Sequence, residues 1–199
     1  MKLLFTITAT LIFCLNLAAQ EDVKSNILSV NLGAYIPTSD FKDVYEDVDM
    51  GTSFAMSGSY QHYLTRTVGI GASMLITVRD TEEDGRYAIY DIEQGIFFIS
   101  LLGVKRFLIS PKLDIYVQGG PSLVINTLNY SGDETTHGTM GFTLGAGSRY
   151  YLAESFFLGL EAGYNYAKVK YEFDTAPSSM EKRQDLGGFT LGVSAGIAF

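Results

Sequence analysis

The chain has 199 residues, enough for one domain, and carries 22 acidic against 14 basic residues for a net charge of -8. This balance argues against nucleic acid as a partner, because phosphate contacts require Lys and Arg side chains. Hydrophobic residues make up 47% of the chain, yet beyond its start no apolar run approaches the ~20 residues of a membrane-spanning helix. An exported chain of this kind can instead cross a membrane with strands of alternating character.

The chain begins with a targeting signal. A basic start at Lys2 is followed by an apolar stretch from Leu3 to Leu17 and by small residues. This is the pattern of a secretory signal peptide, too short and wrongly flanked for a membrane anchor. We expect residues 1–20 to be removed by cleavage near Ala19 or Gln20, which leaves residues 21–199 as one domain. The single cysteine lies inside the signal, so no disulfide is expected in the exported domain.

Eight later segments alternate between large apolar residues and small or polar residues. Leu28, Val30 and Leu32, for example, alternate with Ser29 and Asn31. A period of two over segments of this length predicts β-strands whose faces meet different surroundings. The expected strands lie at residues 26–37, 52–64, 68–79, 95–108, 113–126, 140–149, 156–165 and 187–199.

Two of the expected strands are irregular. The fourth contains "GIFFISLLGV", Gly95 to Val104, and is apolar on both faces, so the alternation does not assign its inward positions. In the fifth, Pro121 cannot donate a hydrogen bond to a neighbouring strand. A bulge or a local break is therefore expected beside Gly119 and Gly120.

The connections alternate in length. Short polar turns are expected near residues 65–67, 110–112 and 153–155, and long acidic loops over residues 38–51, 80–94, 129–138 and 172–187. Short turns on one side and long loops on the other are typical of outer-membrane barrels, whose closure leaves no strand edge facing lipid. The sequence therefore predicts an all-β fold, an eight-stranded antiparallel up-and-down transmembrane β-barrel with both termini on the short-turn side.

Aromatic residues gather towards both ends of the expected strands, as in the interfacial girdles of membrane barrels. The girdle at the short-turn side is expected to contain Tyr60, Tyr63, Phe107, Tyr150, Tyr151, Phe156 and Phe157. The girdle at the long-loop side is expected to contain Tyr35, Phe54, Phe142, Tyr164, Tyr166 and Phe189.

The chain ends on "GGFTLGVSAGIAF", in which Val193, Ala195, Ile197 and Phe199 alternate with small residues. This ending, together with "LGAYIPTSDF", "FFISLLGVKRFL" and "LDIYVQGGPSLVI", resembles the small outer-membrane β-barrel family, labelled "porin family" or "outer membrane protein beta-barrel domain". The transmembrane domains of outer membrane proteins A and X are similar in architecture. The resemblance implies that the barrel-assembly machinery recognises the terminal strand ending in Phe199.

The interior of an eight-stranded barrel is just wide enough for side chains. Arg149 and Glu161 are expected to face it from neighbouring strands, and buried charges should pair. We therefore expect an interior salt bridge between them, which Asp114 can join. A gate or solute path is the alternative interpretation.

One motif approaches a calcium-binding loop. In "DTEEDGRYAIYD", acidic residues at Asp80, Glu82 and Asp84 are followed by Gly85 and Asp91, close to the loop pattern that surrounds Ca²⁺ with oxygen atoms. Glu at the third position and Asp at the twelfth depart from that pattern. The alternative is an acidic, solvated loop, and we expect no other metal site and no cofactor.

An enzymatic role finds little support. The two histidines are His62, in the second expected strand, and His137, in the third long loop, and neither has a serine two residues on. Lipid-acting barrel enzymes require a placed nucleophile and base, and the one G-x-S-x-G in the sequence, Gly192 to Gly196, lies inside the last expected strand. We expect no catalytic residues.

The expected role is structural or interactive: a monomeric outer-membrane protein of a Gram-negative-type cell, embedded in the bilayer with lipopolysaccharide and presenting acidic loops outside. A narrow channel for ions or small solutes is one alternative, and a barrel subunit of an envelope or secretion complex is another. A soluble lipocalin-type barrel is disfavoured, because small residues stand opposite the large apolar ones.

Overall fold

The computed structural model describes residues 24–38, 51–84, 89–130, 133–175 and 178–199, of which residues 79–84, 89–92, 130, 133–134, 171–175 and 178–183 are described by their backbone alone. No helix in this part of the chain is long and apolar enough to cross a membrane. The strands are β1 (Asn26–Pro37), β2 (Ser53–Tyr63), β3 (Val68–Asp84), β4 (Ile89–Ser110), β5 (Leu113–Tyr130), β6 (Asp133–Tyr151), β7 (Phe156–Thr175), β8 (Ser178–Asp185) and β9 (Gly188–Ala198).

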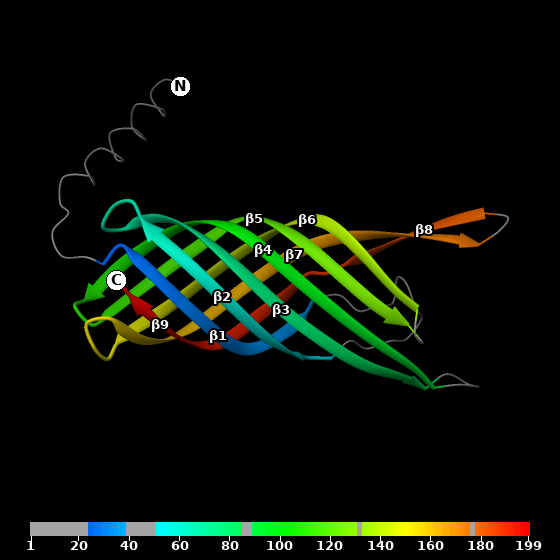
Figure 1. Ribbon diagram of the computed structural model, residues 1–199, viewed down its shortest axis with the longest axis horizontal. Helices are drawn as coiled ribbons and strands as arrows, with labels where there is room; N and C mark the ends of the chain where they lie inside the picture. The colour runs from blue at the N-terminus through cyan, green and yellow to red at the C-terminus, as the bar shows by residue number, and fades with distance from the viewer. Residues whose placement is uncertain (1–23, 39–50, 85–88, 131–132, 176–177) are drawn as a thin grey trace, which may run out of the picture.

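Eight of these strands close into a barrel. Each pairs antiparallel with its neighbours in the order β1 to β7 and then β9, and β9 pairs with β1. Figure 1 shows the tilted strands wrapping around one axis, with the C-terminus at the end that carries the short turns. The start of β1 lies at the same end, since the backbone of Asn26 and that of Phe199 exchange two hydrogen bonds of 2.9 Å. The predicted eight-stranded barrel is confirmed.

The strand registers determine the width of the barrel. Following paired residues once around the barrel from Asn26 leads back to β1 at Ile36, ten residues further along the strand. For eight strands this stagger corresponds to a strand tilt of roughly 40°. Such a barrel has room for side chains and little else, so the lumen is a packed interior rather than a wide pore.

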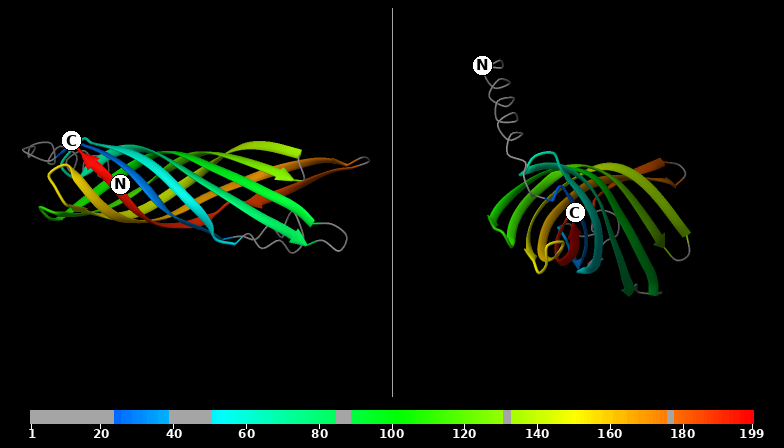
Figure 2. Two further views of the ribbon diagram at one scale, coloured as in Figure 1. Left: turned by 60° about the horizontal axis from the view of Figure 1, so that its bottom comes forward. Right: turned by 60° about the vertical axis from the view of Figure 1, so that its left-hand side comes forward.

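Three of the long-loop predictions are wrong, because the hairpins continue past the expected strand ends. β3 and β4 stay paired up to Asp84 and Ile89, and β5 and β6 up to Tyr130 and Asp133. β7 continues into a hairpin with β8, which pairs with β7 in a separate sheet. The three extensions project at the end opposite the C-terminus (Figures 1 and 2). The charged residues of these segments led us to predict loops. Beyond the membrane, however, side chains reach water, so a paired strand can carry charged residues there.

The outer wall of the barrel is apolar along every strand. The alternation predicted from the sequence is confirmed, and in β4 the even-numbered residues, such as Phe98 and Leu102, face inward. More than thirty large apolar side chains are exposed on the described chain, as a wall in contact with lipid requires. Those at mid-height include Val30, Leu32, Met74, Leu101, Val117, Leu144, Leu160, Leu191 and Val193.

The girdle prediction holds for the outward aromatic residues and is wrong for four others. Tyr35, Tyr63 and Phe157 are at most 2% exposed and belong to the barrel interior, and Tyr151 packs against the same interior. Successive residues of a strand point to opposite faces, so adjacent pairs such as Tyr150–Tyr151 cannot both face lipid. Of the predicted girdle residues, Tyr60, Phe107, Tyr150 and Phe156 are exposed at the turn end, and Phe54, Phe142, Tyr166 and Phe189 at the other end. Tyr164 is half-buried, with its ring 5.0 Å from that of Phe189.

Pro121 is accommodated by a local break and not by a bulge. The β4–β5 ladder pairs Ser100 with Ser122 and Gly103 with Gly119, and the two positions between are not paired. The register is the same on both sides of this gap, and pairing of β5 with β6 continues through Pro121. The proline therefore loses one short stretch of ladder without shifting the strand.

Inward glycines make room for large rings that cross the lumen. A Cβ atom at Gly147 on β6 would lie 2.6 Å from the ring of Tyr116, far below van der Waals contact. We expect Gly147→Ala to lower the free energy of unfolding by about 1–3 kcal/mol, because the tyrosine must leave its packed position. Urea unfolding of the protein folded into lipid vesicles measures this loss.

Gly58 provides the matched control. It faces outward on β2, and a Cβ atom there would meet nothing within 4 Å. Gly58→Ala is expected to leave stability unchanged or slightly raised, since alanine also restricts the unfolded chain. Equal losses for the two variants would show that the space beside Tyr116 is not the cause.

Candidate functional site: the polar core of the lumen

Two apolar clusters occupy the barrel interior. The cluster near the hairpin extensions consists of Tyr35, Ala55, Leu75, Ile96, Phe98, Val124, Leu128, Ala167, Val169 and Leu186. The cluster near the short turns consists of Ile27, Tyr63, Leu102, Val104, Tyr116, Phe157 and Ala198, with Tyr151 packed against it. Leu186 lies in the link between β8 and β9. Its carbonyl oxygen accepts a hydrogen bond from the hydroxyl of Tyr35 at 2.5 Å. This link therefore caps the lumen from the hairpin end.

A charged cluster lies at the turn end of the lumen. Asp114 on β5 is 3.7 Å from Arg149 on β6 and 4.0 Å from Arg106 on β4, and none of the three is more than 2% exposed. Each guanidinium stacks 3.8 Å from a tyrosine ring, Arg106 on Tyr63 and Arg149 on Tyr116. One carboxylate thus serves two arginines, and aromatic faces stabilise both cations in a site that excludes water.

The predicted salt bridge between Arg149 and Glu161 is wrong, and a relay of two glutamines stands in its place. Arg149 donates to Gln61 Oε1, Gln61 Nε2 donates to Gln118 Oε1 at 2.9 Å, and Gln118 Nε2 donates to Glu161 Oε1 at 3.0 Å. In each of these hydrogen bonds the donor lies on the Arg149 side and the acceptor on the Glu161 side. The aligned amide dipoles therefore connect the Arg149 guanidinium to the Glu161 carboxylate. Asn31 donates to the other oxygen of Glu161 at 3.0 Å.

This network crosses the barrel from side to side. Its members lie on β1, β2, β5, β6 and β7, and the central glutamine Gln61 is 1% exposed. Hydrogen bonds to a charged group are stronger than those between neutral groups, and in a low-dielectric interior they polarise one another. The network therefore fixes the relative positions of strands that are not neighbours in the sheet.

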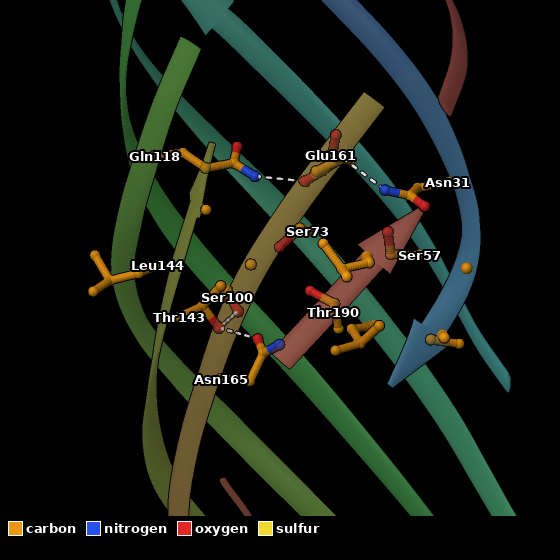
Figure 3. A pocket seen from close by; sticks show the side chains of 18 residues that line it. Asn31, Ser57, Ser73, Ser100, Gln118, Thr143, Leu144, Glu161, Asn165 and Thr190 are labelled. Carbon is orange, nitrogen blue, oxygen red and sulfur yellow. Dashed lines mark hydrogen bonds between the residues drawn. The ribbon is translucent and has the colours of Figure 1, made fainter. Parts of the chain in front are cut away.

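A small polar cavity adjoins Glu161 between the two apolar clusters. Its volume is about 40 Å³, and Figure 3 shows the labelled side chains that surround it, with dashed lines from Glu161 to Asn31 and Gln118. On its other side Ser100, Thr143 and Asn165 join in one hydrogen-bonded chain with bonds of 3.0 Å. The volume leaves room for about two or three water molecules, so it limits any occupant to that size.

A group of neutral polar side chains lies within the apolar cluster near the hairpin extensions. Gln94 on β4 is fully buried and donates to Asn126 at 2.7 Å and to Gln184 at 3.4 Å. Its Oε1 atom has no partner within the described part of the chain. The trio ties the β8 strand to the barrel wall from inside.

The two histidines lie apart from the lumen network. His62 is on the outer face of β2 at the turn end, where Nδ1 is 2.9 Å from the Asn26 Oδ1 atom. His137 lies in β6, paired with Asn126, and not in a loop as predicted. The extended β5–β6 hairpin accounts for that correction.

The calcium-loop candidates remain a prediction. The backbone places Asp80, Glu82 and Asp84 on β3 and Asp91 on β4, with Glu82 opposite Asp91. Their side chains, and all of residues 85–88, lie outside the described part of the structure.

Sequence reasoning found the charged residues of the lumen and missed its amides. Asp114, Arg149 and Glu161 stood out by type and by parity, and the structure brings the first two together. Gln61 and Gln118 carried the same inward parity, but only strand order across the barrel reveals that β2 and β5 face each other through the lumen.

The closed barrel with an apolar outer wall and a filled polar core defines an integral membrane β-barrel protein. Residues 5–199 match the family described as "Outer membrane protein beta-barrel domain", and the chain belongs to it. The predicted family and outer-membrane location are therefore confirmed. A comparison with curated protein sequences finds no match.

Solved structures share the fold at low sequence identity. Neisserial surface protein A has 12% identity and a TM-score of 0.60, over 90% of this chain and 100% of that chain. The outer membrane protein OprG from Pseudomonas aeruginosa has 13% identity and a TM-score of 0.61, over 88% and 97%. Ail, the attachment invasion locus protein of Yersinia pestis, has 17% identity and a TM-score of 0.52, over 87% and 99%.

Proposed function

We propose that this protein is a closed, non-catalytic outer-membrane barrel that acts through the hairpins projecting beyond its apolar wall. The observation that carries the proposal is the filled lumen: apolar clusters at two levels enclose the polar core, and charged side chains are bound to partners within it. A solute path would need to displace both clusters. The projecting hairpins of β3–β4, β5–β6 and β7–β8 supply the surface available to a partner. Acidic residues outnumber basic ones in the first two hairpins, which makes their surface negative, whereas the two kinds balance in the third.

A conductance measurement tests the closed lumen. The purified protein, folded and inserted into a planar bilayer, is expected to show no steady single-channel steps under applied voltage. Insertion is checked separately by the faster migration of the unheated protein in SDS, since closed barrels keep their structure until boiled. Regular steps from protein that passes this check would contradict the proposal.

A narrow channel is the second candidate, and the polar core favours it. The cavity at Glu161 connects through the glutamine relay to Arg149 near the turn end. Apolar clusters lie at both ends of this polar path, and the cluster near the hairpin extensions includes Phe98. Phe98→Ala would thin that cluster. Channel activity that appears in this variant and is absent in the unaltered protein would locate the barrier there.

The proposed surroundings are the lipid bilayer and lipopolysaccharide. Lys168 faces outward at the hairpin end of β7, 5.8 Å from the ring of Tyr166, at the level where lipid phosphates meet the aromatic girdle. The closed sheet leaves no strand edge to pair within the membrane, which supports a monomer. A role as the barrel subunit of an envelope or secretion complex remains compatible with the projecting hairpins.

We further propose cleavage of the signal near Ala19 or Gln20 and recognition of the last strand by the barrel-assembly machinery. Outward apolar side chains at Val193 and Ile197 and an exposed Phe199 at the chain end support that recognition. Phe199→Ala is expected to reduce the folded fraction in the outer membrane without changing the stability of protein refolded in detergent.

A further inference from the structure

The cavity beside Glu161 is lined by hydroxyl groups that have no partner in the protein. Within the described residues, the side chains of Ser57 on β2, Ser73 on β3 and Thr190 on β9 line this space and make no hydrogen bond. Figure 3 shows them around the same hollow as Glu161. All three residues are half-buried, and polar groups in protein interiors are almost always bound to protein, to an ordered ligand or to water. Their hydroxyl groups are therefore free to bind whatever occupies the cavity.

The chemistry of the lining selects the occupant. The amide N–H groups of Asn31 and Gln118 that reach the cavity are already directed at Glu161. The Tyr116 hydroxyl also hydrogen-bonds to Glu161. The groups left over are the lone pairs of the carboxylate that these three side chains do not occupy and three hydroxyl groups, all of which offer oxygen atoms. Hard cations prefer such a set of oxygen ligands, whereas an anion would find no unused cationic donor there.

The distribution of charge points the same way. Both interior ion pairs of the described chain involve Asp114, which Arg106 and Arg149 share at the turn end. Glu161 lies two glutamines away from the nearer arginine, and no Lys, Arg or His nitrogen of the described residues is within ion-pair distance of it. Negative charge is therefore concentrated at the middle of the barrel, beside the cavity.

We infer that the cavity binds one monovalent cation of about the size of sodium, held by Glu161 and by the hydroxyl groups of Ser57, Ser73 and Thr190. A site with one carboxylate suits a monovalent cation, because calcium and magnesium sites take more oxygen ligands and usually more anionic ones. A cavity of about 40 Å³ admits such an ion with one or two waters. This site is independent of the proposed role of the projecting hairpins.

The experiment compares thermal unfolding of the full barrel in sodium chloride and in choline chloride at equal ionic strength. The protein is refolded into zwitterionic micelles in each salt, so that entry through the apolar clusters does not limit binding, and unfolding is followed by circular dichroism. Sodium at about five times its dissociation constant is expected to raise the midpoint by about 2–4 °C. Choline is too large for the cavity and serves as the reference.

Three variants assign the effect to the cavity. Glu161→Gln keeps the size of the side chain and is expected to abolish the difference between the salts, while Glu154→Gln in the exposed β6–β7 turn keeps it. Ser73→Ala removes one ligand without touching the relay, and is expected to reduce the difference even if Glu161→Gln does not fold. Equal midpoints in both salts for the unaltered protein, or a difference that survives in Ser73→Ala and Glu161→Gln, would overturn the inference and leave a cavity filled with water only.

Discussion

Replacing Asp114 by asparagine is expected to destabilise the barrel by about 3–5 kcal/mol, because it leaves two buried arginines without their shared carboxylate. Arg106 and Arg149 are each at most 2% exposed and lie within 4.0 Å of this side chain. Asparagine preserves shape and can still accept the hydrogen bond that the Tyr151 hydroxyl donates at 2.9 Å. The lower free energy of unfolding of Asp114→Asn would therefore come from the missing negative charge and not from altered packing. Urea unfolding in phospholipid vesicles measures it.

A double variant separates this cause from a general weakness at the position. If the loss comes from uncompensated guanidinium groups, adding Arg149→Met to Asp114→Asn removes one of them. The double variant should then be less destabilised than the sum of the two single variants, a coupling that contact pairs commonly show. Strict additivity would contradict the electrostatic interpretation. Glu154→Gln, which removes an exposed negative charge from a turn, controls for the change in net charge and is expected to be neutral.

The outer wall of this fold was predictable because lipid imposes one requirement on every outward residue. An apolar residue every second position, as at Leu28, Val30 and Leu32, is enough to predict a strand and its orientation. In β4 the alternation could not assign the inward positions, because lipid determines the outward residues only. Its inward residues, among them Ile96, Phe98 and Leu102, form part of the interior clusters, so both faces are apolar and the alternation disappears.

The interior was predictable only in part, because its contacts join strands that are distant in sequence. Parity alone places Arg149 and Glu161 in the lumen, and their opposite charges suggest a direct pair. The actual partners depend on the registers of five strands, which bring Gln61 and Gln118 between them. The hairpin extensions failed for another reason: beyond the membrane, strands no longer need an apolar face, so their composition is that of loops.

The largest effect at the outer wall is expected at mid-height, where an arginine would face the hydrocarbon centre. Leu160 is 64% exposed on the outer side of β7, about midway between the aromatic residues that mark the two interfaces. We expect Leu160→Arg to lower the free energy of unfolding in phospholipid vesicles by about 2–4 kcal/mol. The same substitution at Leu152, equally outward but in the short β6–β7 turn, is expected to cost only about 0–1 kcal/mol, because the side chain reaches headgroups and water.

The comparison tests the orientation of the whole barrel, because both leucines are exposed on the described chain and differ mainly in depth. A protein that stood in water with these faces solvated would tolerate arginine equally at both positions. Depth dependence in vesicles that vanishes when the same variants are unfolded from short-chain detergent micelles would tie the effect to bilayer thickness. Equal losses at Leu160 and Leu152 in vesicles would contradict a lipid-facing wall, and the apolar band on β7 would need another partner to cover it.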